Sequence, residues 1–167
     1  MNQSTRYSYD LMGNLLTLTD AKGQTTSFEY DGHFRVKKTI YPAGAFETFS
    51  YDTRGRLTSM VDRKDITTTY AYDDLGRLTG KAFSDGTPAF SYTYDVAGRM
   101  LTAVNGADTL TWVYNLAGEL LSEQSARNAS TVAYQYDDGG NRIEVKLDGT
   151  VFVTYGYDDA SRLTTIT

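Results

Sequence analysis

A tyrosine–aspartate pair recurs along the whole chain at nearly constant spacing. The steps between successive tyrosines are 20 to 22 residues, and the tyrosines are Tyr9, Tyr30, Tyr51, Tyr72, Tyr94, Tyr114, Tyr136 and Tyr157. An aromatic residue also lies two positions before each tyrosine, as Phe49 does before Tyr51. Because side chains two apart share one face of a β-strand, both rings of each copy lie on the same face. Eight such copies predict an array of repeated structural units.

A tight turn is predicted directly after each tyrosine. Aspartate follows the tyrosine in seven copies, and glycine stands four residues after the tyrosine in six. Aspartate accepts hydrogen bonds from turn amides and glycine readily takes a positive φ, so Asp-x-x-Gly predicts a type I turn closed by a left-handed residue. Five copies hold both residues: Asp10 and Gly13, Asp52 and Gly55, Asp73 and Gly76, Asp95 and Gly98, and Asp137 and Gly140. Phe34 and Ser161 replace the glycine elsewhere, and we expect Phe34 to strain its turn or to change its type.

An arginine commonly follows the turn, and a leucine, methionine or valine usually comes next. The turn geometry predicts that aspartate faces arginine across the turn on one sheet face, while tyrosine faces leucine on the other. The predicted ion pairs are Asp52–Arg56, Asp73–Arg77, Asp95–Arg99 and Asp158–Arg162. Exposed ion pairs contribute little, so we expect the tyrosine–leucine contacts to stabilise the sheet more, because they remove apolar area from water.

A second, less regular turn lies between the copies. Its clearest examples are the pairs Asp85-Gly86, Asn105-Gly106 and Asp148-Gly149, which are strong hairpin signals. Each repeat is therefore two short strands and two turns. No segment shows a helical period, and the composition does not shift along the chain. We predict an all-β fold, an antiparallel β-hairpin repeat array, forming a single domain over residues 1–167.

The repeat resembles the YD repeat of Rhs proteins. The unit Tyr-x-Tyr-Asp-x-x-Gly-Arg-Leu-Thr, as in residues 70–79, carries the resemblance, which extends from about Tyr7 to Thr164. That family includes the Rhs toxins of bacterial type VI secretion, the cocoon subunits of insecticidal ABC toxin complexes and the animal teneurins. The resemblance implies a long antiparallel sheet wound into a hollow shell, which in the bacterial proteins encloses a toxic C-terminal domain. It implies a passenger toxin polypeptide or neighbouring YD repeats as partners.

Several features of that family are absent from this sequence. No variable toxin region follows the repeats, and the Asp-Pro element of the family's autoproteolytic segment is missing, because Pro42 and Pro88 follow Tyr41 and Thr87. The chain is also too short to close a cavity. We therefore expect a section of a longer shell, or self-association through the open terminal strands. The first residues have no apolar core, so no signal peptide is expected, and the resemblance implies a secreted or cell-surface location within a larger exported protein.

Composition argues against several classes of function. The net charge is −5, and the arginines are spread at repeat spacing, which argues against nucleic acid as a partner. No apolar run approaches the length of a membrane span. His33 is the only histidine and there is no cysteine, so no metal site, cofactor site or catalytic residue is predicted. We expect a protein that is not an enzyme and whose role is structural, enclosing or presenting a toxin or adhesion module.

A carbohydrate-binding surface is the alternative function, because rows of tyrosine rings can stack on sugars. Recognition is expected where the repeat is broken, at the second, sixth and eighth copies and at the two open ends, and the candidate residues lie in the sixth copy. It holds the only tryptophan, Trp112, and replaces the aspartate and arginine by Asn115 and Glu119. Single tryptophans with a polar edge often mark a binding surface. These three residues are the candidate binding residues for a glycan.

Overall fold

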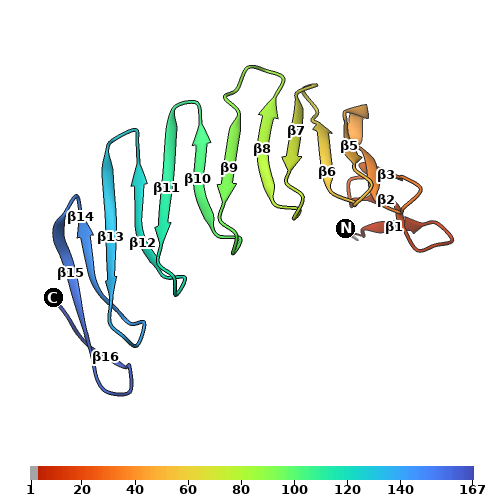
Figure 1. The fold of residues 1–167 in the computed structure, drawn as a ribbon. Helices are drawn as coiled ribbons and strands as arrows, with labels where there is room; N and C mark the ends of the chain where they lie inside the picture. Colours follow the sequence, from red (N-terminus) through yellow and green to blue (C-terminus); the bar gives the residue numbers. More distant parts are fainter. Residues whose placement is uncertain (1–3) are drawn as a thin grey trace. The chain divides into compact units, whose positions relative to one another are not determined.

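The structure is a computed structural model that describes residues 4–167, and its strands are labelled in chain order in Figure 1. The strands fall into two compact units. The first unit, Met1–Thr87, contains β1 (Arg6–Tyr9), β2 (Leu15–Thr19), β3 (Thr25–Tyr30), β4 (Val36–Ile40), a 3₁₀ turn at Pro42–Gly44, β5 (Phe46–Tyr51), β6 (Leu57–Val61), β7 (Thr67–Tyr72) and β8 (Leu78–Phe83). The second unit, Pro88–Thr167, contains β9 (Phe90–Tyr94), β10 (Met100–Asn105), β11 (Asp108–Tyr114), β12 (Leu120–Ser125), β13 (Ser130–Tyr136), β14 (Arg142–Leu147), β15 (Thr150–Tyr157) and β16 (Leu163–Ile166).

Within each unit, every strand pairs antiparallel with the strand that follows it in sequence. The predicted opposition of tyrosine and leucine is seen in β5 and β6, where Tyr51 pairs with Leu57. The register shifts by one residue between Ser50 and Tyr51, so the turn ends in a β-bulge. The same shift recurs at the equivalent place in other copies, such as Ala71/Tyr72 and Val113/Tyr114. The predicted fold class, all-β antiparallel hairpin repeats, is confirmed.

The turn after each tyrosine has one hydrogen-bond pattern throughout the described chain. In the third copy, the amide of Asp52 donates to the carbonyl of Arg56 (2.9 Å), and the amide of Gly55 donates to the carbonyl of Asp52 (3.0 Å). Gly55 has φ +84°, the left-handed conformation that a residue without a Cβ adopts at little cost. This conformation aims the next strand back along the first one.

Phe34 and Ser161 keep this turn although they are not glycine. The amide of Phe34 donates to the carbonyl of Asp31 (3.1 Å), and Phe34 itself has φ +62°. Ser161 has φ +56° and makes the same bond to Asp158 (2.9 Å). The sequence left open whether Phe34 strains its turn or changes its type. The turn type is retained, and Phe34 adopts the left-handed conformation that disfavours residues with a Cβ.

Phe34→Gly is expected to stabilise the chain. A left-handed residue with a Cβ costs about 1 kcal/mol relative to glycine, and Phe34 is 56% exposed, so its ring buries little. Urea unfolding of Phe34→Gly should give a higher midpoint than the parent chain. Gly55→Ala is the matched reverse change at an equivalent turn and should lower the midpoint. A lower midpoint for Phe34→Gly would show that the exposed ring contributes more than the backbone loses.

The sheets have no conventional hydrophobic core. Among residues 4–167 no hydrophobic residue is buried, and only Thr39, at 8% exposed, counts as a buried polar residue. The two faces differ in character where the repeat is regular: in β7, Tyr70 and Tyr72 lie on one face, and Thr69 and Ala71 on the other. We call these the aromatic face and the hydroxyl face. Stability must therefore come from half-buried rings and from hydrogen bonds between strands.

Hydroxyl groups pair across strands on the hydroxyl face. The pairs are Ser8–Thr17 (2.5 Å), Thr19–Thr25 (2.9 Å), Thr93–Thr102 (2.7 Å) and Thr154–Thr167 (2.6 Å). Such cross-strand pairs satisfy each other's polar groups and strengthen the pairing of adjacent strands. They suit a face that no second layer of the described chain covers.

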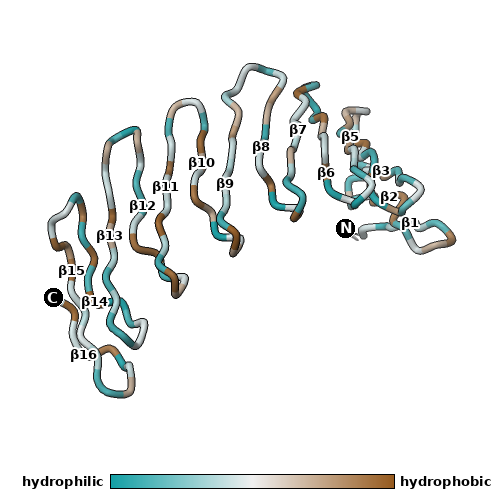
Figure 2. Tube along the Cα trace, viewed as in Figure 1, coloured by the Kyte–Doolittle hydropathy of each residue, from teal (hydrophilic) through white to brown (hydrophobic). Residues whose placement is uncertain are grey.

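Apolar side chains also stand at the tips of several turns. Leu11, Val96 and Leu116 each directly follow the turn aspartate or asparagine and are fully exposed. Figure 2 shows this as hydrophobic colour at the turns between β9 and β10 and between β11 and β12. These turn tips are therefore available for contact with another molecule or chain segment. No helix in residues 4–167 is long and apolar enough to cross a membrane.

Candidate functional site: the inter-repeat ladder

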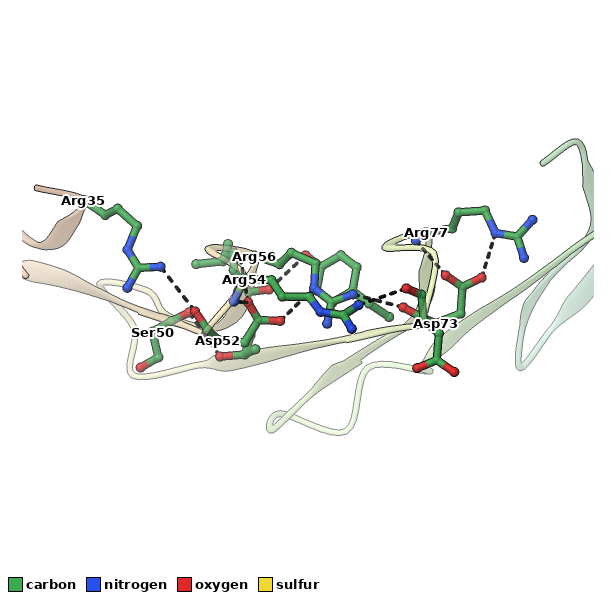
Figure 3. Close-up of polar contacts among 11 residues, drawn as sticks. Arg35, Ser50, Asp52, Arg54, Arg56, Asp73 and Arg77 are labelled. Atoms are coloured by element: carbon green, nitrogen blue, oxygen red, sulfur yellow. Dashed lines mark hydrogen bonds and ion pairs between the residues drawn. The ribbon is translucent and has the colours of Figure 1, made fainter. Parts of the chain in front are cut away.

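Each turn aspartate organises its own turn through both carboxylate oxygens. Asp52 Oδ1 accepts hydrogen bonds from the amides of Arg54 and Arg56, both at 2.9 Å, and Oδ2 accepts one from Arg56 Nε at 2.7 Å. The three other predicted ion pairs are also present, and a fifth joins Asp31 to Arg35 at 2.6 Å. Figure 3 shows the arginines and aspartates of the third and fourth copies. The carboxylate therefore closes the turn and orients the arginine.

These hydrogen bonds favour the ionised carboxylate. The side chain of Arg35, helped by the amides of Arg35 and His33, lowers the pKa of Asp31 to about 2. In the next copy, the Arg56 amide and then its side chain hold the pKa of Asp52 below the ordinary value of 3.8. Desolvation opposes both shifts but is outweighed. The turns are therefore built for a charged aspartate.

The arginine pairs with the aspartate of its own turn, and its guanidinium also contacts the next repeat. Arg56 Nη1 donates to the carbonyl of Asp73 at 3.0 Å, and its Cζ lies 4.8 Å from the ring centroid of Tyr72 (Figure 3). The equivalent contacts join Arg35 to Asp52 (3.3 Å) and Tyr51 (4.6 Å), and Arg99 to Asn115 (3.1 Å) and Tyr114 (4.8 Å). A cation over a ring face is favourable, more so when partly desolvated.

The tyrosine hydroxyl connects each such repeat to the preceding one, whereas the arginine contacts the following one. Tyr51 donates to the carbonyl of Val36, in the preceding repeat, at 2.9 Å. The same bond recurs from Tyr30 to Leu15, Tyr72 to Leu57, Tyr136 to Leu120 and Tyr157 to Arg142, at 2.8 to 3.0 Å. We call these arginine and tyrosine contacts the inter-repeat ladder. It links successive copies beyond the strand pairing itself.

The ladder corrects one part of the sequence interpretation. The pattern assigned the Asp–Arg pair and the tyrosines to opposite sheet faces. Instead, the guanidinium of Arg35 lies over the ring of Tyr51, because a long side chain at the turn end can fold onto the aromatic face of the next copy. The tyrosine-to-carbonyl bond was also not predicted, since nothing within one repeat indicates which backbone atom of its neighbour lies within reach.

The ladder changes where the arginine is missing. In the first copy, Asn14 Nδ2 donates to its own Asp10 (2.7 Å). In the seventh, Asn141 Nδ2 donates to Asp137 (3.0 Å) and to Ser161 Oγ of the next copy (3.1 Å). In the sixth, the charge pattern is altered: Asn115 stands for the aspartate and donates through Nδ2 to Glu119 Oε2 at 2.5 Å.

The structure does not bring the three candidate binding residues into one site. Trp112, on β11, lines a hollow of about 230 Å³ with Leu110, Glu123 and Val132 among its other walls. Glu123 accepts a hydrogen bond from Tyr134 (2.5 Å), and burial together with this bond raises the pKa of that tyrosine to about 12. Asn115 and Glu119 line a different hollow, of about 520 Å³. Glycan binding at either hollow stays a prediction.

His33 serves its turn through its backbone, because its amide donates to Asp31 Oδ1 at 2.8 Å. No group of three or more histidine, cysteine, aspartate or glutamate side chains in residues 4–167 is arranged to hold a metal ion. The aspartates that follow the repeat tyrosines instead accept hydrogen bonds from turn amides, as Asp52 does.

A sequence model of the Teneurin YD-shell family matches residues 1–103. The chain belongs to this YD-shell family. No curated protein sequence matches the chain. Its fold is similar to that of a TcdB2-TccC3 crystal structure without the hypervariable C-terminal region (TM-score 0.77, 19% identity, 97% of this chain). It is also similar to a Photorhabdus luminescens Tc holotoxin pore structure (TM-score 0.69, 18% identity, 98% of this chain). The chain spans only 10% and 12% of those chains.

Proposed function

We propose that this YD-shell chain is a wall segment of an Rhs-type shell that encloses or presents a passenger polypeptide, either a toxin or an adhesion module. The observation that carries the proposal is the inter-repeat ladder. Within each unit it joins neighbouring copies by contacts that recur with the sequence, as Arg56 contacts Asp73 and Tyr72. A sheet held together in this way needs no second layer, which is a suitable construction for a thin wall.

The mechanism is steric. A continuous sheet of paired backbones leaves no opening large enough for a protease or a target to reach a chain behind it, and its own polar groups are satisfied by strand pairing. The aromatic face offers half-buried rings such as Tyr70 and Tyr72 to whatever lies against it. The same proposal places the chain in a larger exported protein, secreted or held at the cell surface. Glycan binding and self-association through terminal strands stay predictions.

A chimeric shell tests the wall role. In a TcdB2-TccC3 chain that includes its C-terminal region, the structurally equivalent segment would be replaced by residues 4–167; the match to such a structure covers 99% of this chain. We expect trypsin to digest the C-terminal region of the chimera no faster than that of the unmodified TcdB2-TccC3 chain, digested alongside it. A glycine–serine insert of equal length is the matched control and should leave that region open to digestion. Equal digestion of the chimera and the glycine–serine control would overturn the wall role.

A further inference from the structure

The hollow beside Trp112 is built from two rows of residues on the aromatic face of β11, β12 and β13. Trp112, Glu123 and Val132 form the first row, because Trp112 pairs with Glu123 and Glu123 pairs with Val132. The second row, in the same register, is Leu110, Ser125 and Ser130. All of these residues line the hollow, whose volume is about 230 Å³. The three strands lie in one unit, and their pairing fixes the walls.

A small residue opens this hollow in the surface of the sheet. The position of Ser125 holds a large side chain in three other copies, namely Tyr41, Phe83 and Leu147. A serine side chain fills much less of the space over the strands. Its hydroxyl donates to Asp108 Oδ2 at 2.9 Å, so its one donor is already used. The hollow is therefore a departure from the repeat and does not recur in every copy.

Glu123 places an unpaired negative charge in the hollow. The residue opposite the first aromatic of each copy is neutral or basic in the seven other copies: Leu18, Thr39, Met60, Lys81, Ala103, Val145 and Ile166. Glu123 Oε1 accepts the Tyr134 hydroxyl at 2.5 Å, whereas Oε2 accepts no hydrogen bond and pairs with no cation among residues 4–167. Glu123 is half-buried, and a partly desolvated charge without a counter-ion is costly.

The other walls favour the same kind of ligand as the carboxylate does. No lysine or arginine of the described chain lines the hollow, and most of its surface is apolar. The face of a tryptophan ring attracts cations more strongly than the other aromatic rings do. Leu110 and Val132 favour a ligand that has apolar groups. The complement of these walls is an organic cation whose charge is spread over methyl groups.

We propose that the Trp112 hollow binds a small methylated ammonium ion such as choline. Its methyl groups would lie against the Trp112 ring and Val132, with the positive charge facing Glu123 Oε2. A primary ammonium suits the hollow less, because its three N–H donors need acceptors on leaving water and only one carboxylate oxygen is free. A sugar would leave Glu123 without a counter-ion. The inference goes beyond the wall role and does not depend on it.

The size of the hollow fits this class of ligand. Its volume of about 230 Å³ is below the range of about 300 to 1,000 Å³ typical of pockets for drug-sized molecules. The hollow also offers no basic side chain for a phosphate group, which Glu123 would repel. We therefore expect free choline to bind more tightly than phosphocholine.

Choline chloride is the probe, titrated into the isotopically labelled full chain at constant ionic strength. Trp112 is the only tryptophan, so its indole N–H gives a single NMR signal, which we expect to shift saturably. The neutral isostere of choline, in which carbon replaces the ammonium nitrogen, should give no saturable shift. Glu123→Gln keeps an acceptor for Tyr134 and should weaken choline binding about tenfold. Asp159→Asn, an exposed acid of another turn, is the matched control and should bind as the parent does.

Ser125→Leu tests whether the hollow itself is the site. Leucine stands at this position in the seventh copy as Leu147, so the variant should fold, fill the hollow and abolish the shift while Trp112 and Glu123 remain. Circular dichroism checks that each variant is folded before its binding is scored.

Several results would overturn the site. They are the absence of a saturable shift with choline, equal binding of the neutral isostere, undiminished binding by folded Ser125→Leu, and an equal loss in Asp159→Asn and Glu123→Gln. Tighter binding of phosphocholine, or a saturable shift with glucose but not with choline, would also overturn it, the last in favour of sugar binding. Because the titration contains no passenger, its result leaves the outcome of the chimeric shell experiment unaffected.

Discussion

Tyr51→Ala is expected to lower the free energy of unfolding by about 3 kcal/mol, since it removes an aromatic ring, a ring–cation contact and a hydrogen bond together. The ring of Tyr51 lies under the Arg35 guanidinium at 4.6 Å, and its hydroxyl donates to the Val36 carbonyl at 2.9 Å. A sheet without a buried hydrophobic core cannot redistribute such a loss over other packing. Urea unfolding followed by tyrosine fluorescence and far-ultraviolet circular dichroism measures the change.

Two further variants separate the contribution of the hydroxyl hydrogen bond from that of the ring. Tyr51→Phe keeps the ring and removes only the hydroxyl bond, so it should cost about 1 kcal/mol. Tyr7→Ala removes a ring that is 55% exposed, at the edge of the first unit, and should cost less than Tyr51→Ala. If Tyr7→Ala and Tyr51→Ala destabilised the chain equally, the inter-repeat ladder would not be what holds adjacent copies together.

Acid is expected to unfold the chain over a narrow pH range, because the same lowering of an aspartate pKa recurs in several copies of the repeat. Hydrogen bonds from the side chain and the amide of the residue four positions on lower the pKa of six turn aspartates: Asp10, Asp31, Asp52, Asp73, Asp137 and Asp158. A lowered pKa in the folded state means that the unfolded chain binds protons more readily. Each aspartate therefore stabilises the fold above its ordinary value of 3.8, and this contribution is lost as the pH falls through its folded-state pKa.

The pH range of unfolding follows from the direction of these pKa shifts. The urea midpoint should be nearly flat at weakly acidic and neutral pH and should fall steeply between about pH 4 and pH 2, the lower limit being the pKa of about 2 for Asp31. Asp52→Asn retains a turn acceptor, as Asn115 does naturally, but loses the ion pair with Arg56. Its midpoint should be lower than the parent's at neutral pH and should fall less steeply on acidification. A parent midpoint that does not change down to pH 2 would contradict the role of the charged turns.

Much of the molecule could be read from the spacing of a few residue types. The tyrosine–aspartate pair predicted strands that end at Tyr51 and Tyr72, and the structure has those ends in β5 and β7. The Asp52–Arg56 pair was predicted from the turn, because a three-residue turn leaves only one cross-strand partner within reach. These features are local, since each depends on residues at most a few positions apart.

The candidate site was accessible from the sequence only in part. The sixth copy was singled out because Asn115 and Glu119 break the repeat, but the sequence grouped them with Trp112, which lines a separate hollow on β11. Their positions along the strands explain why the residues line different hollows. Trp112 pairs directly with Glu123 on β12, while Glu119 lies at the turn end of the sheet beside Gly140 of the next copy. Closeness along the chain did not indicate which neighbouring repeat each side chain would meet.

The repeated tyrosine–aspartate pair by itself determined the strand ends and the turn type, because backbone geometry and turn chemistry act within one copy. The same repeated residues also indicated the family. Tertiary structure alone decided that Arg56 binds its own Asp52 and the following Asp73 carbonyl at once, and that Tyr51 reaches back to Val36. Those contacts depend on the lateral spacing and register of strands some fifteen to seventeen residues apart, as the sequence separations of these bonded pairs show. The repeat period supplies the neighbours, and the sheet determines which of their atoms meet.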